Sequence, residues 1–143
     1  MHYGWQDNPA MWQSAAEAIR NLKWSHCPLL VGYRHSIPSA SGIYVMTLTA
    51  AHVLETAPIW EHVQAPMYIG KSGNLATRFT QHMSGLTGTK EFIHNFPRVT
   101  FWFTKVNDPE MSRVEAELIK VFGPPVNRKQ PTLRGRILDP VPA

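Results

Sequence analysis

The spacing of apolar and polar positions predicts a chain of helices and short strands. Apolar residues recur at helical spacing after Asn8 and Pro9, which favours an N-terminal helix that ends before Cys27. The next apolar run, residues 29–33, is short enough to form either a strand or a packed connector. The beginning of the chain therefore predicts one helix ahead of any clear strand.

Three later segments have the composition of strands. Residues 42–48 are rich in β-branched and aromatic side chains, residues 66–70 end at a glycine, and residues 99–106 partly alternate. Helices are expected over residues 75–84 and 109–122. This order predicts an α+β fold, in which a small three-stranded, mainly antiparallel sheet is flanked by helices and the first two strands form a hairpin.

The helix expected over residues 109–122 places a carboxylate among its apolar residues. At about 100° per residue, with Met111 at zero, Val114 falls near −60° and Ile119 near +80°. Glu115 falls inside this arc at about +40°, whereas Glu117 falls outside it at about −120°. A buried carboxylate needs a cation. Glu115 therefore indicates either a structural ion pair at the core edge or a metal ligand.

The helix expected over residues 75–84 directs two polar side chains toward its apolar stripe. His82 falls within the stripe, and Arg78 lies one turn earlier at its edge. One interpretation is an Arg78–Glu115 salt bridge beside a core histidine. The other is a phosphate bound by Arg78 near a metal ion held by Glu115. Just upstream, Lys71 lies in a glycine-containing turn before the helix N-terminus, a favourable place for an anion.

Composition narrows the function classes. The chain has 143 residues, 43% of them hydrophobic and 17% charged, which fits one domain with a packed core. No apolar run has the length of a membrane span and the N-terminus lacks a secretory pattern, so a cytoplasmic protein is expected. The single cysteine excludes an internal disulfide. A net charge of +4 suits a polyanionic partner.

Two tripeptides resemble the signatures of the GIY-YIG nuclease superfamily. They are Gly42-Ile43-Tyr44 and Tyr68-Ile69-Gly70, one on each strand of the expected hairpin. Over residues 40–130 the likeness continues at further positions that the family uses: Lys71, Arg78, His82, Glu115 and Asn127. The 23 residues between Tyr44 and Tyr68 are more than is usual for the family, so a longer loop or an inserted helix is expected around residues 50–63.

This resemblance implies a DNA endonuclease that hydrolyses phosphodiester bonds with one Mg²⁺ or Mn²⁺ per site. Glu115 would be the sole protein ligand of the cation, which suits an ion that keeps its waters, and Arg78 would bind a phosphate oxygen. Tyr44, Tyr68 and His82 are candidates for the base that activates water, and Tyr44 is favoured. Lys71 would add positive charge, and Asn127 would fix the site by hydrogen bonding.

The expected organisation has three parts. Residues 1–38 form a helical extension packed on the domain, residues 39–130 the nuclease-like domain, and residues 131–143 a basic, proline-containing tail. DNA contacts are expected from the basic residues Lys71, Arg128, Lys129, Arg134 and Arg136. A one-site enzyme that cuts both strands would act as a homodimer. The alternatives are a catalytically inactive nucleic-acid-binding module of the same fold, or an interaction protein anchored by Trp12 and Trp24.

Overall fold

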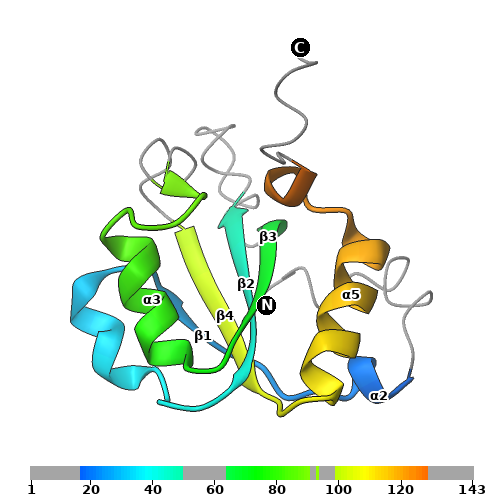
Figure 1. Ribbon diagram of the computed structural model, residues 1–143. Coiled ribbons are helices and arrows are strands. Elements are labelled where there is room, and N and C mark those ends of the chain that lie inside the picture. Colours follow the sequence, from blue (N-terminus) through cyan, green and yellow to red (C-terminus); the bar gives the residue numbers. More distant parts are fainter. Residues whose placement is uncertain (1–16, 50–63, 91–92, 94–98, 129–143) are drawn as a thin grey trace.

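The computed structural model describes residues 17–49, 64–90, 93 and 99–128. These residues form an α+β fold in which helices flank an antiparallel sheet (Figure 1). Its elements, in chain order, are α2 (Glu17–Arg20), β1 (Ser25–Pro28), the 3₁₀ helix η2 (Val31–Ser36), β2 (Gly42–Thr49), β3 (Gln64–Ser72), α3 (Leu75–Met83), β4 (Val99–Lys105), α5 (Glu110–Phe122) and the 3₁₀ helix η5 (Pro125–Arg128).

The sheet has the strand order β1-β4-β2-β3, with every neighbouring pair antiparallel. Strands β2 and β3 pair directly, as the sequence predicts, and Tyr44 lies opposite Gly70 in their register. On the other side of β2, Tyr44 lies opposite Phe103 of β4. Strand β2 is therefore central, and β3 forms an edge of the described sheet.

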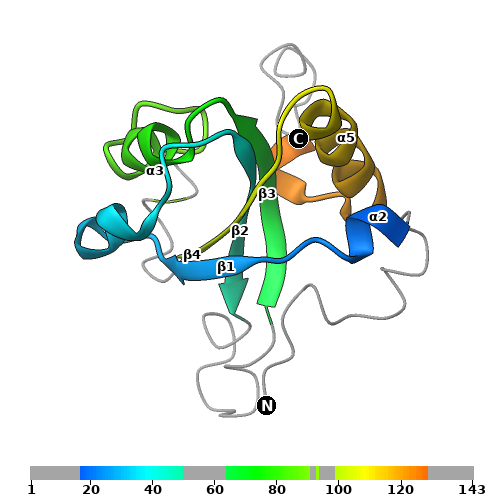
Figure 2. The same cartoon turned by 90° about the horizontal axis from the view of Figure 1, so that it is seen from below.

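Helices α3 and α5 lie on opposite faces of this sheet (Figures 1 and 2). Because successive side chains of a strand point to opposite faces, β2 contributes to two separate cores. Ile43 and Val45 pack with apolar residues of α5, whereas Tyr44 and Met46 pack with those of α3. Successive residues of β2 therefore belong alternately to the two cores.

The sheet has four strands, so the expected three-stranded sheet is wrong by one. The additional strand is β1, in which Cys27 lies opposite Phe101 of β4. It is four residues long with one buried side chain, too short to show a strand periodicity, and its partner lies far away in sequence. Residues 29–33, expected to be a strand or a packed connector, form no strand, and residues 31–33 belong to the 3₁₀ helix η2 (Val31–Ser36).

The expected N-terminal helix is described only at its end, where α2 covers Glu17–Arg20. Ile19 of α2 is fully buried in the core beneath α5. The expected helix extends to just before Cys27, but α2 ends at Arg20 and Ser25–Pro28 form β1, so this part of the prediction is wrong. The part of the expected helix before residue 17 and the expected insertion around residues 50–63 lie outside the described residues. Within the described part of the chain, no helix combines the length and the apolar character needed to cross a membrane.

Candidate active site

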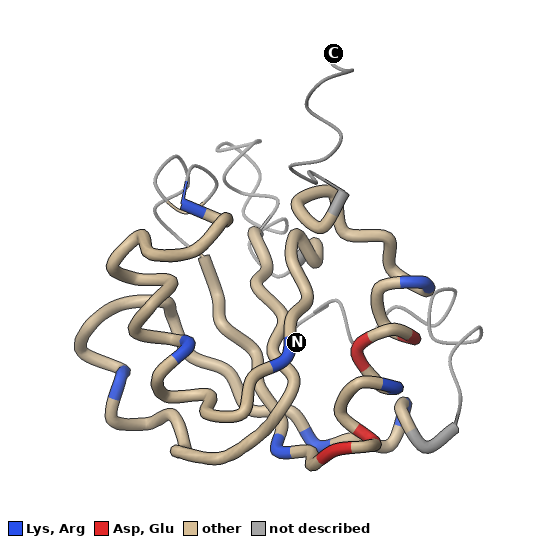
Figure 3. Tube along the Cα trace, in the orientation of Figure 1, with Lys and Arg blue, Asp and Glu red and all other residues tan. Residues whose placement is uncertain are grey.

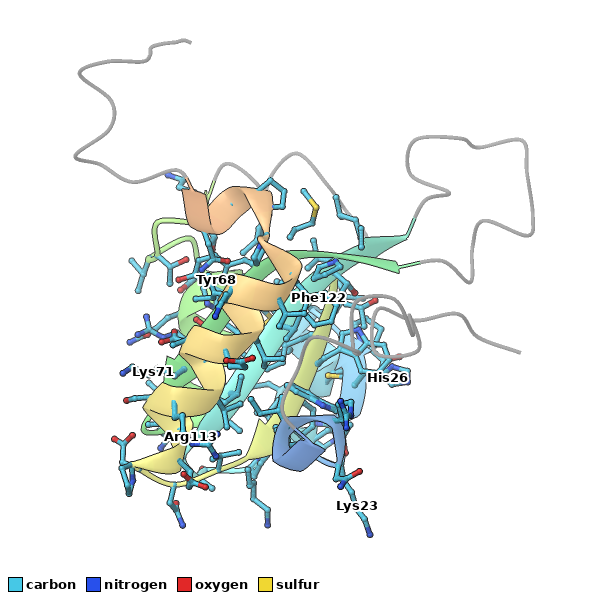
Figure 4. The ribbon with its side chains drawn as sticks, turned by 90° about the vertical axis from the view of Figure 1, so that its right-hand side faces the viewer. Lys23, His26, Tyr68, Lys71, Arg113 and Phe122 are labelled. Carbon is cyan, nitrogen blue, oxygen red and sulfur yellow. The ribbon has the colours of Figure 1, made fainter. Side chains whose placement is uncertain are left out.

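The expected site residues gather along the edge strand β3, where α3 and α5 approach it from opposite faces. Tyr68 packs against the core on the α3 side. Lys71, three residues later, points to the other side and donates a hydrogen bond to Ser112 Oγ of α5 at 2.7 Å. Figure 4 shows Tyr68 and Lys71 along the same edge of the molecule, beside α5 and far from His26. Side chains from both helices can therefore reach one strand.

Tyr44 and His82 form the buried part of the site. The Tyr44 side chain is 2% exposed, and its hydroxyl lies 2.8 Å from Nε2 of His82, which is 1% exposed. The Tyr44 ring stacks on Phe101, with centroids 5.2 Å apart. Tyr68 lies beside both, with its ring centroid 6.1 Å from that of Tyr44 and 6.0 Å from that of His82. All three candidates for the base are thus brought together.

The glycines of both tripeptides are explained by close approach. A Cβ at Gly70 would lie 2.5 Å from Cζ of Tyr44, because the Tyr44 ring crosses β3 at this residue. A Cβ at Gly42 would lie 2.6 Å from Cδ1 of Leu75 at the start of α3. Glycine at these two positions therefore lets Tyr44 and α3 pack directly against the backbone.

The environment of His82 keeps its imidazole neutral. Burial, and then the nearby Arg78 charge, lower the pKa of His82 to about 3. Its Nδ1 lies 2.8 Å from Thr87 Oγ1 and 2.9 Å from Thr89 Oγ1, so both ring nitrogens have hydrogen-bond partners. The two threonines are not predicted from the sequence, because nothing in it separates them from ordinary residues of a turn.

The protein's own groups favour the phenol form of Tyr44. Burial, and then Tyr68, raise the pKa of Tyr44 far above the usual value, and the opposing effect of Arg78 is smaller. Arg78 thus favours the phenolate, but burial and Tyr68 outweigh its effect. Glu115 of α5 also raises this pKa, so its carboxylate is close enough to interact with Tyr44 electrostatically.

Arg78 lies half-buried on α3 with no hydrogen-bond partner for Nε among the described residues. Its helix is fixed at its start, where the Asn74 side chain accepts a hydrogen bond from the Thr77 backbone N–H at 3.1 Å. A buried guanidinium nitrogen without a partner loses the hydrogen bonds that it makes in water. Arg78 therefore presents an unmet requirement for an acceptor, preferably an anion.

Glu115 lies half-buried on α5, as its helical angle predicts, and Glu117, which falls outside the predicted arc, is half-buried as well. Burial raises the pKa of its carboxyl, and Lys71 opposes this effect. Glu110 and Arg113 form a salt bridge on the exposed face of α5, and neither Arg78 nor Glu115 takes part in one with another described residue. The Arg78–Glu115 ion pair considered from the sequence is therefore not formed, and both side chains lack an ionic partner among these residues.

Asn127 of η5 closes the outer edge of β3. Its Nδ2 donates to the Ile69 carbonyl oxygen at 2.9 Å, and its Oδ1 accepts from the Ile69 backbone N–H at 2.8 Å. The side-chain amide thus makes both hydrogen bonds that a neighbouring strand would make at this residue. Asn127 connects the C-terminal end of α5 to the strand that contains Tyr68 and Lys71.

The donor set suits one hydrated cation better than an enclosed metal site. The described residues contain no group of three or more His, Cys, Asp or Glu side chains that could hold a metal ion. Glu115 is a single half-buried carboxylate, and Mg²⁺ commonly keeps several waters while binding one or two carboxylates. Figure 3 shows acidic positions along α5 and basic positions on α3 and β3.

Several expected DNA contacts are not tested by the structure. Arg128 ends η5, but its side chain lies outside the described residues, as do Lys129, Arg134 and Arg136 entirely. Of the basic residues assigned to DNA binding, Lys71 is the one whose side chain is described. It is exposed at the β3 edge.

Solved structures with the same fold include those of the N-terminal GIY-YIG endonuclease domain of UvrC from Thermotoga maritima. The magnesium-bound domain superimposes with a TM-score of 0.50 at 21% identity, over 78% of this chain and 98% of that one. A point mutant bound to the catalytic divalent cation gives a TM-score of 0.51 at 20% identity, over 78% and 97%. The chain has the GIY-YIG endonuclease fold.

The GIY-YIG fold that the two tripeptides predict is confirmed by the structure. No protein-family model matches the sequence, and no curated protein matches it either. At 20 to 21% identity, the likeness to the UvrC domain establishes the fold alone. The chemistry at the site of this chain depends on its own residues.

Proposed function

We propose that the chain is an endonuclease that hydrolyses DNA phosphodiester bonds with the help of one divalent cation. The observation that supports this proposal most directly is the state of Arg78 and Glu115. Both are half-buried at the β3 edge, Nε of Arg78 has no hydrogen-bond partner, and neither side chain has an ionic partner among the described residues. A phosphate with a bound cation would satisfy both side chains at once.

Arg78 and Lys71 are the proposed phosphate-binding groups. The guanidinium of Arg78 can donate two parallel hydrogen bonds to non-bridging oxygens, so it is suited to the charge that develops on the phosphate during attack. Lys71 is exposed, and its Nζ is held by Ser112 of α5, so it adds a positive charge at the open side of the strand. Arg78 and Lys71 thus place one positively charged side chain on each face of β3.

Glu115 would hold the divalent cation, Mg²⁺ or Mn²⁺. The solved UvrC domain with this fold binds magnesium as its catalytic divalent cation, which supports the same class of ion here. When bound, the cation would stabilise the negative charge on the phosphate and on the leaving oxygen. The protein's part is to supply one half-buried carboxylate that forms no salt bridge with Arg78.

We assign Tyr44 as the base that accepts a proton from the attacking water. The water attacks phosphorus as the bond to the leaving oxygen breaks, and the water's proton passes to the phenol oxygen. The phenol's own proton passes to Nε2 of His82, which lies 2.8 Å from the Tyr44 hydroxyl. The imidazole is neutral before the reaction, so one of its ring nitrogens has a lone pair that can take this proton. Tyr68, beside both rings, would position the water or the phosphate.

Replacement of Glu115 tests the proposed site. The Glu115→Gln variant should lose at least about 100-fold in the rate of DNA cleavage with Mg²⁺ or Mn²⁺, because it removes the carboxylate that would hold the cation. Its fold should be intact, since the uncharged amide is less costly to bury than the carboxylate. Mg²⁺ should also raise the melting temperature of the wild-type protein and leave that of Glu115→Gln unchanged.

Glu117→Gln is the matched control, because Glu117 lies on the same helix outside the arc of Glu115 and should be dispensable for cleavage. A Glu115→Gln protein with full activity would rule out the proposed metal site. The wild-type protein could instead bind DNA without cleaving it, whether Mg²⁺, Mn²⁺ or a chelator is present. That result would favour the inactive nucleic-acid-binding module.

A further inference from the structure

Thr87 and Thr89 are the members of the buried network that the proposed function leaves without a role. Both hydroxyl oxygens lie against Nδ1 of His82, at 2.8 Å from Thr87 and 2.9 Å from Thr89. The two hydroxyl oxygens are themselves 2.7 Å apart. Thr89 is 3% exposed, so its hydroxyl is withdrawn from water. The three polar atoms form a closed triangle on the side of the imidazole opposite Tyr44.

The number of hydrogens in this triangle determines which nitrogen of His82 is protonated. If Nδ1 has no hydrogen, two hydroxyl hydrogens must serve three short contacts, and one contact brings two lone pairs together. If Nδ1 carries a hydrogen, its N–H points between the two oxygens, and one hydroxyl donates to the other. All three contacts are favourable only in this second arrangement.

We infer that Thr87 and Thr89 hold His82 in the Nδ1–H tautomer, and thereby make Nε2 the acceptor for the Tyr44 hydroxyl. A neutral imidazole has one N–H, so the hydrogen bond made by one nitrogen sets the role of the other. With Nδ1 protonated, Nε2 presents its lone pair to the Tyr44 hydroxyl at 2.8 Å. The opposite tautomer would direct an N–H at Tyr44, and Nε2 could not take the phenol proton.

This inference rests on the proposed function and specifies part of it. In the proposed proton transfer, the proton of the attacking water moves to the Tyr44 oxygen while the Tyr44 proton moves to Nε2. His82 therefore ends with both ring nitrogens protonated. The threonine oxygens accept from Nδ1–H before and after the transfer. They touch neither water nor phosphate in this scheme, so they are positioning residues that act through His82.

The tautomer can be measured without any assay of activity. In histidine-labelled protein at pH 7, long-range ¹H–¹⁵N spectra distinguish a protonated ring nitrogen from a bare one, and His82→Gln identifies the signals of His82. We expect a protonated Nδ1 and a bare Nε2 in the wild-type protein. A protonated Nε2 would overturn the inference whether or not the protein cleaves DNA.

Variants of Thr87 and Thr89 test whether their hydroxyls determine the tautomer of His82. In Thr87→Val/Thr89→Val both acceptors of Nδ1–H are lost, so the signals of His82 should move toward the Nε2–H form, and Thr87→Ser/Thr89→Ser should restore the wild-type spectrum. Thr80→Val is the matched control, because Thr80 Oγ1 donates to the Ala76 carbonyl oxygen of its own helix at 3.1 Å. If the double valine variant does not fold, Thr87→Val alone replaces it. An unchanged tautomer in a folded valine variant would contradict the role of the threonines.

Kinetics provide the second readout. The cleavage rate at saturating DNA should fall about tenfold or more in the valine variant, with KM unchanged, and the serine variant should recover it. Equal loss of rate in Thr80→Val would show a general structural effect and refute the specific one. Absence of cleavage in every protein, wild type included, would refute the proposed function, while the spectra would still decide the tautomer.

Discussion

At the scale of single residues, Gly70 is required by the side chain opposite it. Gly70→Ala would place a Cβ 2.5 Å from Cζ of Tyr44, whose ring is fixed by its stacking on Phe101. We expect this change to lower the free energy of unfolding by about 1–3 kcal/mol, measured by urea denaturation. The control is Gly73→Ala, where a Cβ has no neighbour within 4 Å. Equal stability of the two variants would mean that Tyr44 can move aside.

His82 makes the stability of the protein sensitive to acid. Burial, followed by the Arg78 charge, lowers the pKa of His82 to about 3 from its ordinary 6.5. Between these values the unfolded state binds more protons than the folded state, so the free energy of unfolding falls as the pH decreases below 6.5. Tyr44 faces the ring, and burial raises its pKa far above this range, so the phenol stays uncharged.

The His82→Gln variant should therefore lose part of this acid sensitivity. Urea denaturation between pH 7 and 5 should give a slope that is smaller than the wild-type slope by up to about 1.4 kcal/mol per pH unit. His35→Gln, at an exposed position on η2, is the control and should keep the wild-type slope. Parallel curves for wild type and His82→Gln would show that this histidine titrates normally.

The site residues differ in how far the sequence could predict them. The inward position of Glu115 follows from helical geometry, and so does the placement of Arg78 and His82 on the buried side of α3. Thr87 and Thr89 could not be predicted, because they belong to no periodic element and reach His82 only through the path of the chain after α3. The neutrality of His82 likewise depends on burial that no local pattern shows.

At the scale of elements, the edge of β3 is held by one amide. Asn127→Asp keeps an acceptor for the Ile69 N–H but replaces the donor, so a carboxylate oxygen would face the Ile69 carbonyl oxygen now 2.9 Å from Nδ2. We expect a loss of about 1–3 kcal/mol in the free energy of unfolding, measured by thermal or urea denaturation. Asn21→Asp, at an exposed position, should have little effect. An Asn127→Asp variant with unchanged stability would show that η5 is positioned by other contacts.

Most elements were predictable, and the exception has a clear cause. The expected strands at 42–48, 66–70 and 99–106 correspond to β2, β3 and β4, and the expected helices at 75–84 and 109–122 correspond to α3 and α5. Strand β1 was missed because its four residues form a strand only through pairing with β4, which is more than 70 positions away in sequence.

At the scale of the whole molecule, the segment expected to be an extension completes the sheet. Strand β1 and the buried side chains of Ile19, Leu29 and Ile37 all precede residue 39. A protein consisting of residues 39–128 should therefore lose cooperative thermal unfolding, measured by circular dichroism, because it exposes the β4 edge and parts of both cores. Residues 17–128 should retain it. If both proteins unfolded cooperatively at equal midpoint temperatures, the domain boundary at residue 39 that the sequence predicts would be supported.

The amide of Asn127 also has a consequence for association between molecules. An unprotected edge strand offers backbone donors and acceptors to a strand of another chain, which is a common route to aggregation. Asn127 occupies both groups of Ile69 in the middle of the nine-residue strand β3, so an incoming strand would find its hydrogen bonds already made there. The same contact that fixes the candidate site thus disfavours the growth of the sheet into a fibre.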